Sequence, residues 1–362
     1  MKEPRAAGYD PSMRTYDRLA GLEVTIEGVE FEDLREVVSA GFERRSTIIH
    51  VHGGGLVGVG EDVAYDPRDH AILQRFGLRL PPPGRYTLDS YSRALNDLWL
   101  FAFKPVHAAA VNYRRWAIES AVLDLALRQA GIGLEAALGR TAQPLRFVCS
   151  LNLGDPVDLS KIQRRLAIDP NLRFKLDPAP NWTSRVIVDL AELGVVDTLD
   201  FKGHYDADVG VNPPHPAMYA QLIGAFPDAW IEDPRLTPEV DAVLLPHRDR
   251  VTWDAPIHGV ADIEALPFAP TMVNIKPSRI GPISALLDCY DWLAERGIGA
   301  YCGGQFELGV GRGQVQSFAA IFHPDAPNDI APRPWNLAEP PADAPNTPLE
   351  PRLLDVGLGL QG

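Results

Sequence analysis

The fold is decided by two stretches, Leu172-Arg173-Phe174-Lys175-Leu176 and Met272-Val273-Asn274-Ile275-Lys276, because each is a short apolar run with a lysine at or near its end. Three similar runs between them end in carboxylates, at Asp200, Glu232 and Asp254. Charged groups at the carboxyl ends of successive parallel strands gather at the active face of a βα barrel. The sequence therefore predicts a barrel with two amines and three acids at one face.

Strand-type runs recur along the second part of the chain, near residues 147–151, 172–176, 196–201, 228–232, 251–254, 272–276 and 298–302. Helix-type stretches lie between several of these runs, for example 183–193, 217–226 and 283–296. Alternation of strands with helices is typical of βαβ units and a parallel sheet. Seven repeats and a weak eighth favour an α/β fold with a closed (β/α)7β barrel of the TIM type over an open doubly wound sheet.

The first part of the chain has another pattern. Residues 15–27 and 46–51 read as strands, and the glycines at positions 53–55, 58 and 60 read as hairpin turns. Residues 112–129 carry apolar side chains around most of a helix, which Gly131 ends. We therefore expect an N-terminal α+β capping domain over residues 1–143, the barrel over 144–330, and a C-terminal tail over 331–362 that packs back on the capping domain.

Composition excludes several classes of protein. The chain has 362 residues, of which 46% are hydrophobic, and its net charge of −14 includes no long basic run, so nucleic acid is not an expected partner. The most apolar stretch, residues 98–111, is broken by Lys104 and His107 and does not predict a membrane span. The chain opens on a polar stretch without a signal core. We expect a cytoplasmic protein with no membrane partner.

The three acids predict a metal site. Asp200, Glu232 and Asp254 are separated by about one βα unit each, so three neighbouring strands would present their carboxylates side by side. Taken singly, each acid could simply cap the helix that follows it. Together they repel one another unless a cation intervenes, and oxygen ligands suit a hard ion such as Mg²⁺, with Mn²⁺ as its substitute.

The two lysines predict proton transfer. Lys175 lies one strand before the acids and Lys276 one strand after them, so we expect their amines to face each other across the barrel mouth. A desolvated lysine near a metal has a lowered pKa and can act as a base. A small-molecule carboxylate bound to the metal would lose its α-proton to one amine, and the metal would stabilise the enediolate.

Several longer motifs resemble those of the enolase superfamily, in its muconate-lactonising branch, and most of all the group of o-succinylbenzoate synthase and N-acylamino acid racemase. The helix after Arg114 is similar to the helix that precedes the family's barrel, and residues 230–234 to its Glu-x-Pro metal strand. Residues 274–281, Asn-Ile-Lys-Pro-Ser-Arg-Ile-Gly, resemble its sixth-strand lysine motif, and residues 303–312 its Gly-Gly-Met-x-Glu-x-Gly-x-Gly-Arg segment. Asn328-Asp329-Ile330 resembles a late turn of this group.

The resemblance implies Mg²⁺ on the three acids and an acid/base pair of Lys175 and Lys276. It implies substrate contacts from four further residues: Arg173, Lys202, Ser278 and Glu307. It also implies that the loop before Ser46 and the segment around Glu61 close over the site, and that the chain forms an even-numbered homo-oligomer.

Four positions depart from the family pattern. Arg173 stands in place of a lysine, Lys202 in place of an asparagine, Ala255 in place of a glutamate and Pro282 in place of a glycine. A guanidinium at Arg173 could hold the base or the substrate carboxylate. The ammonium of Lys202 could pair with the metal acids, weaken Mg²⁺ binding or occupy its place.

The sequence leaves the reaction open. Proton abstraction could end in racemisation or epimerisation, or in dehydration of a substrate like that of o-succinylbenzoate synthase. A cycloisomerase and a dipeptide epimerase of the same superfamily are alternatives. An alternative of another class is a non-catalytic binding protein whose metal site has decayed, with Lys202 and Ala255 as marks of that decay.

Overall fold

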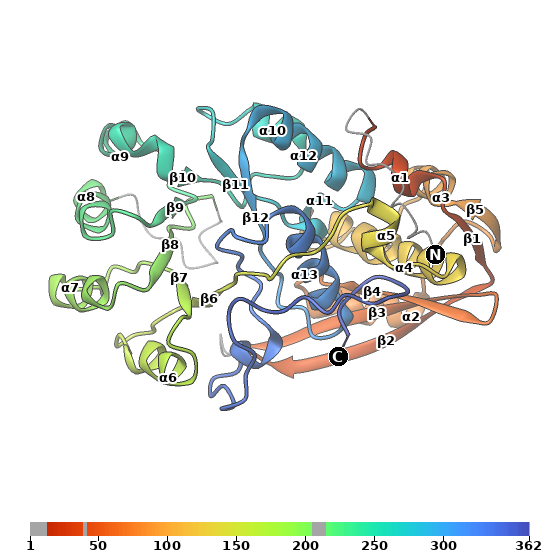
Figure 1. Cartoon of the computed structure of the whole chain (residues 1–362), viewed down its shortest axis with the longest axis horizontal. Helices are drawn as coiled ribbons and strands as arrows, with labels where there is room; N and C mark the ends of the chain where they lie inside the picture. The colour runs from red at the N-terminus through yellow and green to blue at the C-terminus, as the bar shows by residue number, and fades with distance from the viewer. Residues whose placement is uncertain (1–12, 39–41, 205–214, 362) are drawn as a thin grey trace, which may run out of the picture.

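The structure is a computed structural model that describes residues 13–38, 42–204 and 215–361 (Figure 1). Its first part is built on an antiparallel sheet of β2 (Gly28–Val37), β3 (Glu43–Gly53) and β4 (Leu56–Asp62), in the order β2-β3-β4. The long helix α4 (Ala110–Ala130) packs against this sheet and is buried along most of its length. The expected hairpin and buried helix are thus confirmed.

Two glycines of β4 allow the helix to lie directly on the sheet. A Cβ added at Gly58 would lie 2.2 Å from the carbonyl oxygen of Ala121, and one at Gly60 would lie 2.1 Å from that of Ala117. These glycines therefore serve close backbone packing, and the reading of them as turn residues was wrong. The turn itself is made by Gly54 and Gly55, both with positive φ.

Short elements complete this first part: α1 (Asp17–Ala20), β1 (Glu23–Ile26), α2 (Pro67–Phe76), β5 (Gly84–Thr87), α3 (Leu88–Asn96) and α5 (Leu134–Leu138). The strand expected over residues 15–27 is confirmed only in its second half, where β1 pairs with β5. Its first half is the helical turn α1, which buries Leu19 and ends at Gly21.

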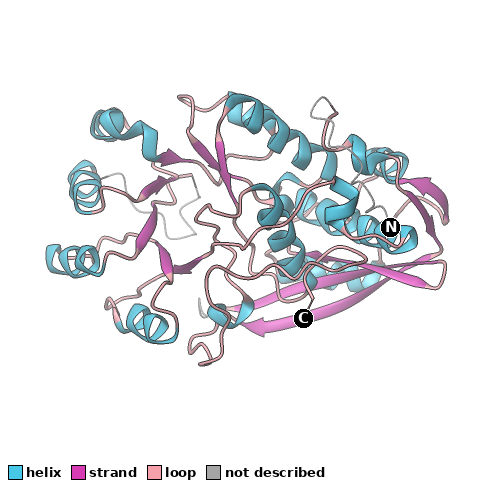
Figure 2. Ribbon diagram, in the orientation of Figure 1, coloured by secondary structure: helices cyan, strands magenta, loops and turns pink. Residues whose placement is uncertain are grey.

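Seven parallel strands follow: β6 (Val148–Leu151), β7 (Arg173–Leu176), β8 (Val196–Asp200), β9 (Trp230–Glu232), β10 (Val251–Thr252), β11 (Met272–Asn274) and β12 (Gly299–Tyr301). Pairing runs in sequence order from β6 to β10 and again from β11 to β12 (Figure 2). A hydrogen bond from the backbone N–H of Asn274 to the carbonyl of Trp253, 2.9 Å long, links the two groups. All seven predicted strands are confirmed.

Helices connect and cover these strands: α6 (Ser160–Ile168), α7 (Ser184–Leu193), α8 (Pro216–Ala225), α9 (Pro238–Leu244), α10 (Val260–Glu264), α11 (Pro277–Ile280), α12 (Ile283–Arg296) and α13 (Val310–Phe322). In the part of the chain that the structure describes, two 3₁₀ segments accompany them, Leu245–Arg250 and Arg333–Asn336. No helix in the described ranges is long and apolar enough to cross a bilayer.

Asn328 closes the barrel in the position of an eighth strand. It forms a parallel bridge to Phe147 at the start of β6, and its neighbour Asp329 bridges to Gly303 after β12. The side-chain oxygen of Asn328 accepts a 2.9 Å hydrogen bond from the N–H of Cys302, and its amide nitrogen donates to the carbonyl of Arg146 at 3.0 Å. One buried side chain thus ties the first strand to the last.

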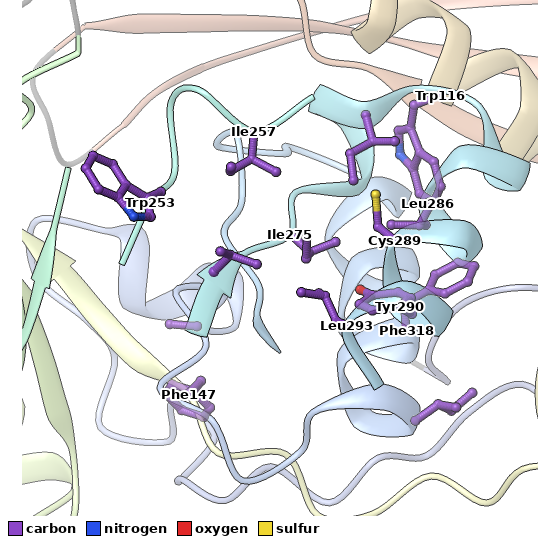
Figure 3. Packing of buried hydrophobic residues seen from close by; sticks show 14 of the residues in the cluster. Trp116, Phe147, Trp253, Ile257, Ile275, Leu286, Cys289, Tyr290, Leu293 and Phe318 are labelled. Carbon is purple, nitrogen blue, oxygen red and sulfur yellow. The ribbon is translucent and has the colours of Figure 1, made fainter. Parts of the chain in front are cut away.

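A continuous apolar core joins the two parts of the chain (Figure 3). Trp116 of α4 meets Phe318 of α13 edge to face, with 5.8 Å between the ring centroids. The tail returns to the first part, where the N–H of Leu358 donates to the carboxylate of Asp124 at 2.7 Å. The expected capping part, barrel and returning tail are therefore one packed body.

We expect the buried His323 to make the fold sensitive to acid. Burial lowers the pKa of His323 from its ordinary value of 6.5 to about 4, although the hydrogen bond to Asn328 at 2.7 Å opposes this shift; the Tyr290 hydroxyl lies 3.1 Å from the other ring nitrogen. The unfolded chain takes up this proton below pH 6.5, so stability present above that pH is lost as the pH falls to about 4.

The expected loss is about 3 kcal/mol at most. Urea unfolding of the wild type and of His323→Gln at several pH values between neutral and acidic would measure it. The stability advantage of the wild type should shrink with acidification, and a constant advantage would contradict the assignment.

Candidate active site

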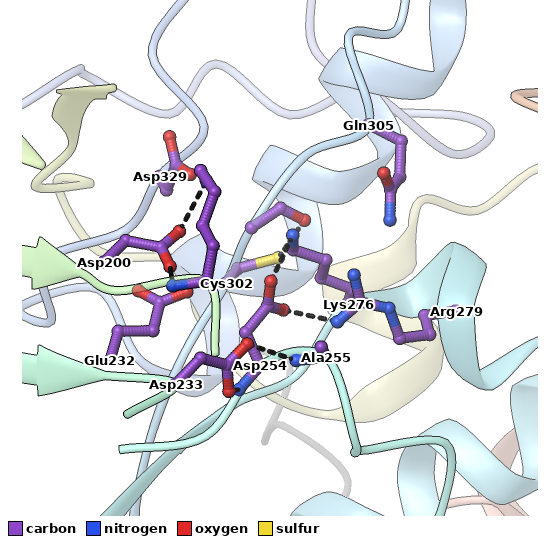
Figure 4. Close-up of polar contacts among 12 residues, drawn as sticks. Asp200, Glu232, Asp233, Asp254, Ala255, Lys276, Arg279, Cys302, Gln305 and Asp329 are labelled. Carbon is purple, nitrogen blue, oxygen red and sulfur yellow. Dashed lines mark hydrogen bonds and ion pairs between the residues drawn. The ribbon is translucent and has the colours of Figure 1, made fainter. Parts of the chain in front are cut away.

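Three buried carboxylates lie side by side at the carboxyl ends of adjacent strands (Figure 4). Asp200 and Glu232 end β8 and β9 and are direct partners in the parallel register. Asp254 follows β10 by two residues. The exposed fractions of these residues are 2%, 0% and 1%. The three predicted acids are thus brought together, away from water.

The two predicted lysines approach this cluster from different strands. Lys175, on β7, places its Nζ 2.6 Å from Glu232 Oε1 and 3.0 Å from Asp200 Oδ2. Lys276, two residues after β11, places its Nζ 2.8 Å from Asp254 Oδ2. Counted from β6, their strands are the second and sixth of the barrel, so the two amines reach the cluster from well-separated strands.

Further charged residues of the site follow the predicted ones closely in sequence. Arg279, three residues after Lys276, bonds Asp254 Oδ1 through its Nη1 at 2.6 Å. Asp233, next to Glu232 and with a positive φ of 47°, accepts the backbone N–H groups of Asp254 and Ala255, both at 2.8 Å. It fixes the chain after β10 and therefore the position of Asp254.

Asp329 completes the ring of carboxylates from the closing segment of the barrel. Its Oδ2 lies 3.4 Å from the Nζ of Lys175. A residue near the end of the chain thus adds a third carboxylate to the two that already contact this amine. Sequence reasoning singled out Asn328-Asp329-Ile330 as a motif but gave Asp329 no role. No local pattern could have assigned this role to Asp329, because it depends on a tertiary contact between residues that are 154 positions apart in the chain.

The ionisation of the cluster is set by burial and by these pairings. Burial alone would lower the pKa of Lys175, but Asp200, Glu232 and Asp329 outweigh it and raise that pKa well above the ordinary value. Burial raises the pKa of Glu232 to about 8, with Lys175 opposing and the neighbouring acids adding to the rise. These carboxylates therefore favour the ammonium form of Lys175, and the lowered pKa expected for a lysine beside a bound metal stays a prediction.

Lys202 joins the site through the same acids. Its Nζ lies 2.9 Å from Asp200 Oδ2 and 3.1 Å from Asp177 Oδ1. The pairing with an expected metal ligand, which the sequence gave as one possibility, is present. Burial opposes the charge of Lys202, but Asp177 and Asp200 raise its pKa above the ordinary value.

One predicted substrate contact, Arg173, is placed elsewhere, and two others, Glu307 and Ser278, stay predictions. Arg173, at the amino end of β7, binds Asp197 and the carbonyl of Gly194, so strand geometry carries it away from the site and that expectation is corrected. Glu307 accepts the N–H of Gln305 at 2.8 Å and pairs with Arg312 at 2.9 Å, and so holds its own loop. Ser278 is buried in α11, directly after Lys276.

Side chains of the first part of the chain form hydrogen bonds with the loop between β12 and α13. Glu61, fully buried, accepts the backbone N–H groups of Leu308, Gly309 and Gly311 at 2.6 to 3.0 Å. Gln305 is likewise held by the hydroxyls of Tyr65 and Tyr113, at 2.7 and 3.3 Å. The segment around Glu61 thus binds this loop, and its closing over the site stays a prediction, whereas residues 39–41 of the loop before Ser46 lie outside the described ranges.

The donor set suits the expected divalent cation. Glu232 Oε2 is buried and has no hydrogen-bond partner. Among the described residues, the site gathers six carboxylates and four cationic groups: Asp177, Asp200, Glu232, Asp233, Asp254 and Asp329 with Lys175, Lys202, Lys276 and Arg279. The carboxylate oxygens face the amines. Within the described ranges, no group of three acidic, histidine or cysteine side chains has the geometry to bind a metal ion.

Comparisons with known proteins find relatives in sequence and in fold. Two curated o-succinylbenzoate synthases, from Geobacillus kaustophilus and Geobacillus stearothermophilus, are 28% and 27% identical over 61% of this chain. The matched region spans 59% of the length of each.

Solved structures agree in fold. A muconate cycloisomerase from Pseudomonas fluorescens has a TM-score of 0.64 at 16% identity, covering 85% of this chain and 87% of that one. A dipeptide epimerase from Methylococcus capsulatus, solved as a complex with a Mg ion, has a TM-score of 0.61 at 19% identity, covering 87% and 92%. The expected barrel with an N-terminal capping part is therefore confirmed, as is the resemblance to the enolase superfamily.

Two family descriptions match this sequence directly. The N-terminal domain of DUF8230, a domain of unknown function, matches residues 17–137, and the C-terminal domain of DUF8230 matches residues 141–337, more than half of the chain. The chain belongs to the DUF8230 family, and its fold is that of the enolase superfamily.

Proposed function

We propose that this protein is an enzyme that removes the proton α to the carboxylate of a small-molecule substrate. The observation that carries the proposal is the pair of buried amines, Lys175 and Lys276, standing on opposite sides of a carboxylate cluster. An α-carbon held between them would have one amine on each face. The names of the curated relatives, both o-succinylbenzoate synthases, support the same class of reaction.

The chemistry requires one amine to begin neutral and the other charged. The neutral amine takes the α-proton, and the electron pair of the broken C–H bond moves into the carboxylate to give an enediolate. The opposite ammonium can return a proton to the other face, which inverts the carbon. Alternatively, the first amine, now an ammonium, gives its proton to a departing β-hydroxyl, which leaves as water and forms a double bond.

A divalent cation on Asp200, Glu232 and Asp254 would supply positive charge for the enediolate oxygens. These carboxylates also hold the proton on Lys175 through their charge, so a cation shared among them would favour release of that proton. We infer Mg²⁺, or Mn²⁺ in its place, from the oxygen-only donor set and from the unpartnered Glu232 Oε2. The dehydration catalysed by an o-succinylbenzoate synthase is the outcome that the named relatives favour.

One observation favours a second candidate, a non-catalytic carboxylate-binding protein. Asp200 and Asp254 each bind two cationic side chains, and Glu232 binds one. Such a cluster is largely neutralised by the chain itself, and it could hold an anion beside its amines without chemistry.

Exchange of the substrate α-proton with solvent separates these candidates. We expect purified wild type, incubated with Mg²⁺ in D₂O and a panel of N-acyl amino acids, dipeptides and o-succinylbenzoate precursors, to introduce deuterium at the α-carbon of at least one compound. Lys276→Ala and Lys175→Ala should each lower the rate at least ~10²-fold, the usual contribution of a positioned acid or base. Proton NMR of the α-carbon signal measures it.

Lys104→Ala is the matched control, because Lys104 is an exposed lysine distant from the site in sequence. It should exchange at the wild-type rate. Exchange by Lys276→Ala at the rate of this control would refute Lys276 as an acid or base. No exchange by the wild type on any compound would favour the binding protein.

Removing one acid should remove the cation. We expect the wild type to retain about one equivalent of Mn²⁺ on dialysis against a micromolar concentration of the ion, and Glu232→Gln to bind it ~10–100-fold more weakly, since a neutral amide replaces the charged ligand. Elemental analysis of the dialysed proteins gives the stoichiometry. Equal retention by Glu232→Gln and wild type would exclude Glu232 as a ligand.

A further inference from the structure

Lys202 binds both oxygens of Asp200 at once. Its backbone N–H donates to Asp200 Oδ1 at 3.0 Å, and its Nζ donates to Asp200 Oδ2 at 2.9 Å. The residue adopts a left-handed backbone conformation, with φ of 52°, which residues other than Gly and Asn adopt at some cost in free energy. Backbone and side chain of one residue thus enclose one carboxylate.

Asp177 holds the same ammonium from the other side. Its Oδ1 lies 3.1 Å from the Nζ of Lys202, whose side chain is 25% exposed, so the amine bridges two carboxylates at the edge of the buried cluster. Asp177 itself contacts no other cation at salt-bridge distance among the described residues. It therefore provides a second partner for Lys202 whenever Asp200 is engaged elsewhere.

We propose that Lys202 is an internal counter-ion that competes with a divalent cation for Asp200, and that Asp177 holds the displaced ammonium when the cation binds. The proposal rests on the metal site of the proposed function and adds a control of cation affinity. An ammonium on Asp200 Oδ2 and a divalent cation on the same oxygen repel each other, so binding of the cation must move Lys202.

Two consequences of opposite sign follow. Without Lys202, Asp200 keeps only the ammonium of Lys175 and has one competitor fewer for the cation, so affinity rises. Without the charge of Asp177, the displaced ammonium loses its second partner and stays on Asp200, so affinity falls. If Asp177 acts only through Lys202, its substitution has no effect once Lys202 is gone.

A double-mutant cycle on Mn²⁺ affinity tests this coupling. Calorimetric titration with Mn²⁺ alone would compare the wild type with Lys202→Asn, Asp177→Asn and the double variant. Asparagine accepts the left-handed conformation of position 202, so the backbone should keep its course. We expect Lys202→Asn to bind at least ~10-fold more tightly than wild type, Asp177→Asn more weakly, and the double variant like Lys202→Asn.

Lys104→Asn, with the same loss of charge on an exposed loop, is the matched control and should bind like wild type. Thermal unfolding gives a second readout. In EDTA, Lys202→Asn should melt below wild type because Asp200 has lost a counter-ion, and Mn²⁺ should raise its melting temperature by more than that of wild type.

The possible failures are distinct. Equal Mn²⁺ affinity of wild type and Lys202→Asn, both binding about one equivalent, overturns the competition and leaves the metal site standing. An additive cycle overturns the role of Asp177. Absence of Mn²⁺ binding in both wild type and Lys202→Asn overturns the metal site of the proposed function together with this inference.

Discussion

The structure depends on keeping several carboxylates out of water at one end of a barrel. Burying an ionised carboxylate without a partner is very costly, and like charges at this distance repel one another. The chain meets this constraint with amines, because Lys175 lies between Asp200 and Glu232 while Lys276 and Arg279 hold the two oxygens of Asp254. The same pairings set the ionisation of the site and leave the buried Glu232 Oε2 without a hydrogen-bond partner.

The rest of the fold serves to hold these side chains in place. Asn328 joins the first and last strands and carries Asp329 to Lys175. Gly58 and Gly60 let the sheet of the first part lie on α4. From the end of that sheet, Glu61 then reaches the backbone of the loop that precedes α13. The first part of the chain and the barrel are thus connected by buried polar contacts as well as by the apolar core.

Much of this arrangement could be predicted from the sequence because strands and their ends are local features. Asp200, Glu232 and Lys276 each follow a short apolar run, and strand order then brings them together. Arg173 shows the limit of this reasoning. It lies two residues before Lys175 and thus on the same side of the strand, but at the amino end, where Asp197 binds it.

Other contacts depend on distances and backbone geometry that no local pattern carries. The ion pair of Asp329 with Lys175 forms only when the barrel closes. The contacts of Lys202 with Asp200 require a left-handed backbone conformation at a position where the sequence has no glycine. The protonated state of Lys175 also depends on three acids from separate segments. The sequence predicted several of the charged residues that form the site. It could not predict how their mutual contacts set the protonation state of each.

Anomalous diffraction from a crystal grown with Mn²⁺ would show whether these carboxylates hold a divalent cation. We expect one anomalous peak within bonding distance of Glu232 Oε2 and in contact with Asp200 and Asp254, with the ammonium of Lys202 moved onto Asp177. A map without a peak at these carboxylates, in which Lys202 still encloses Asp200, would contradict this expectation.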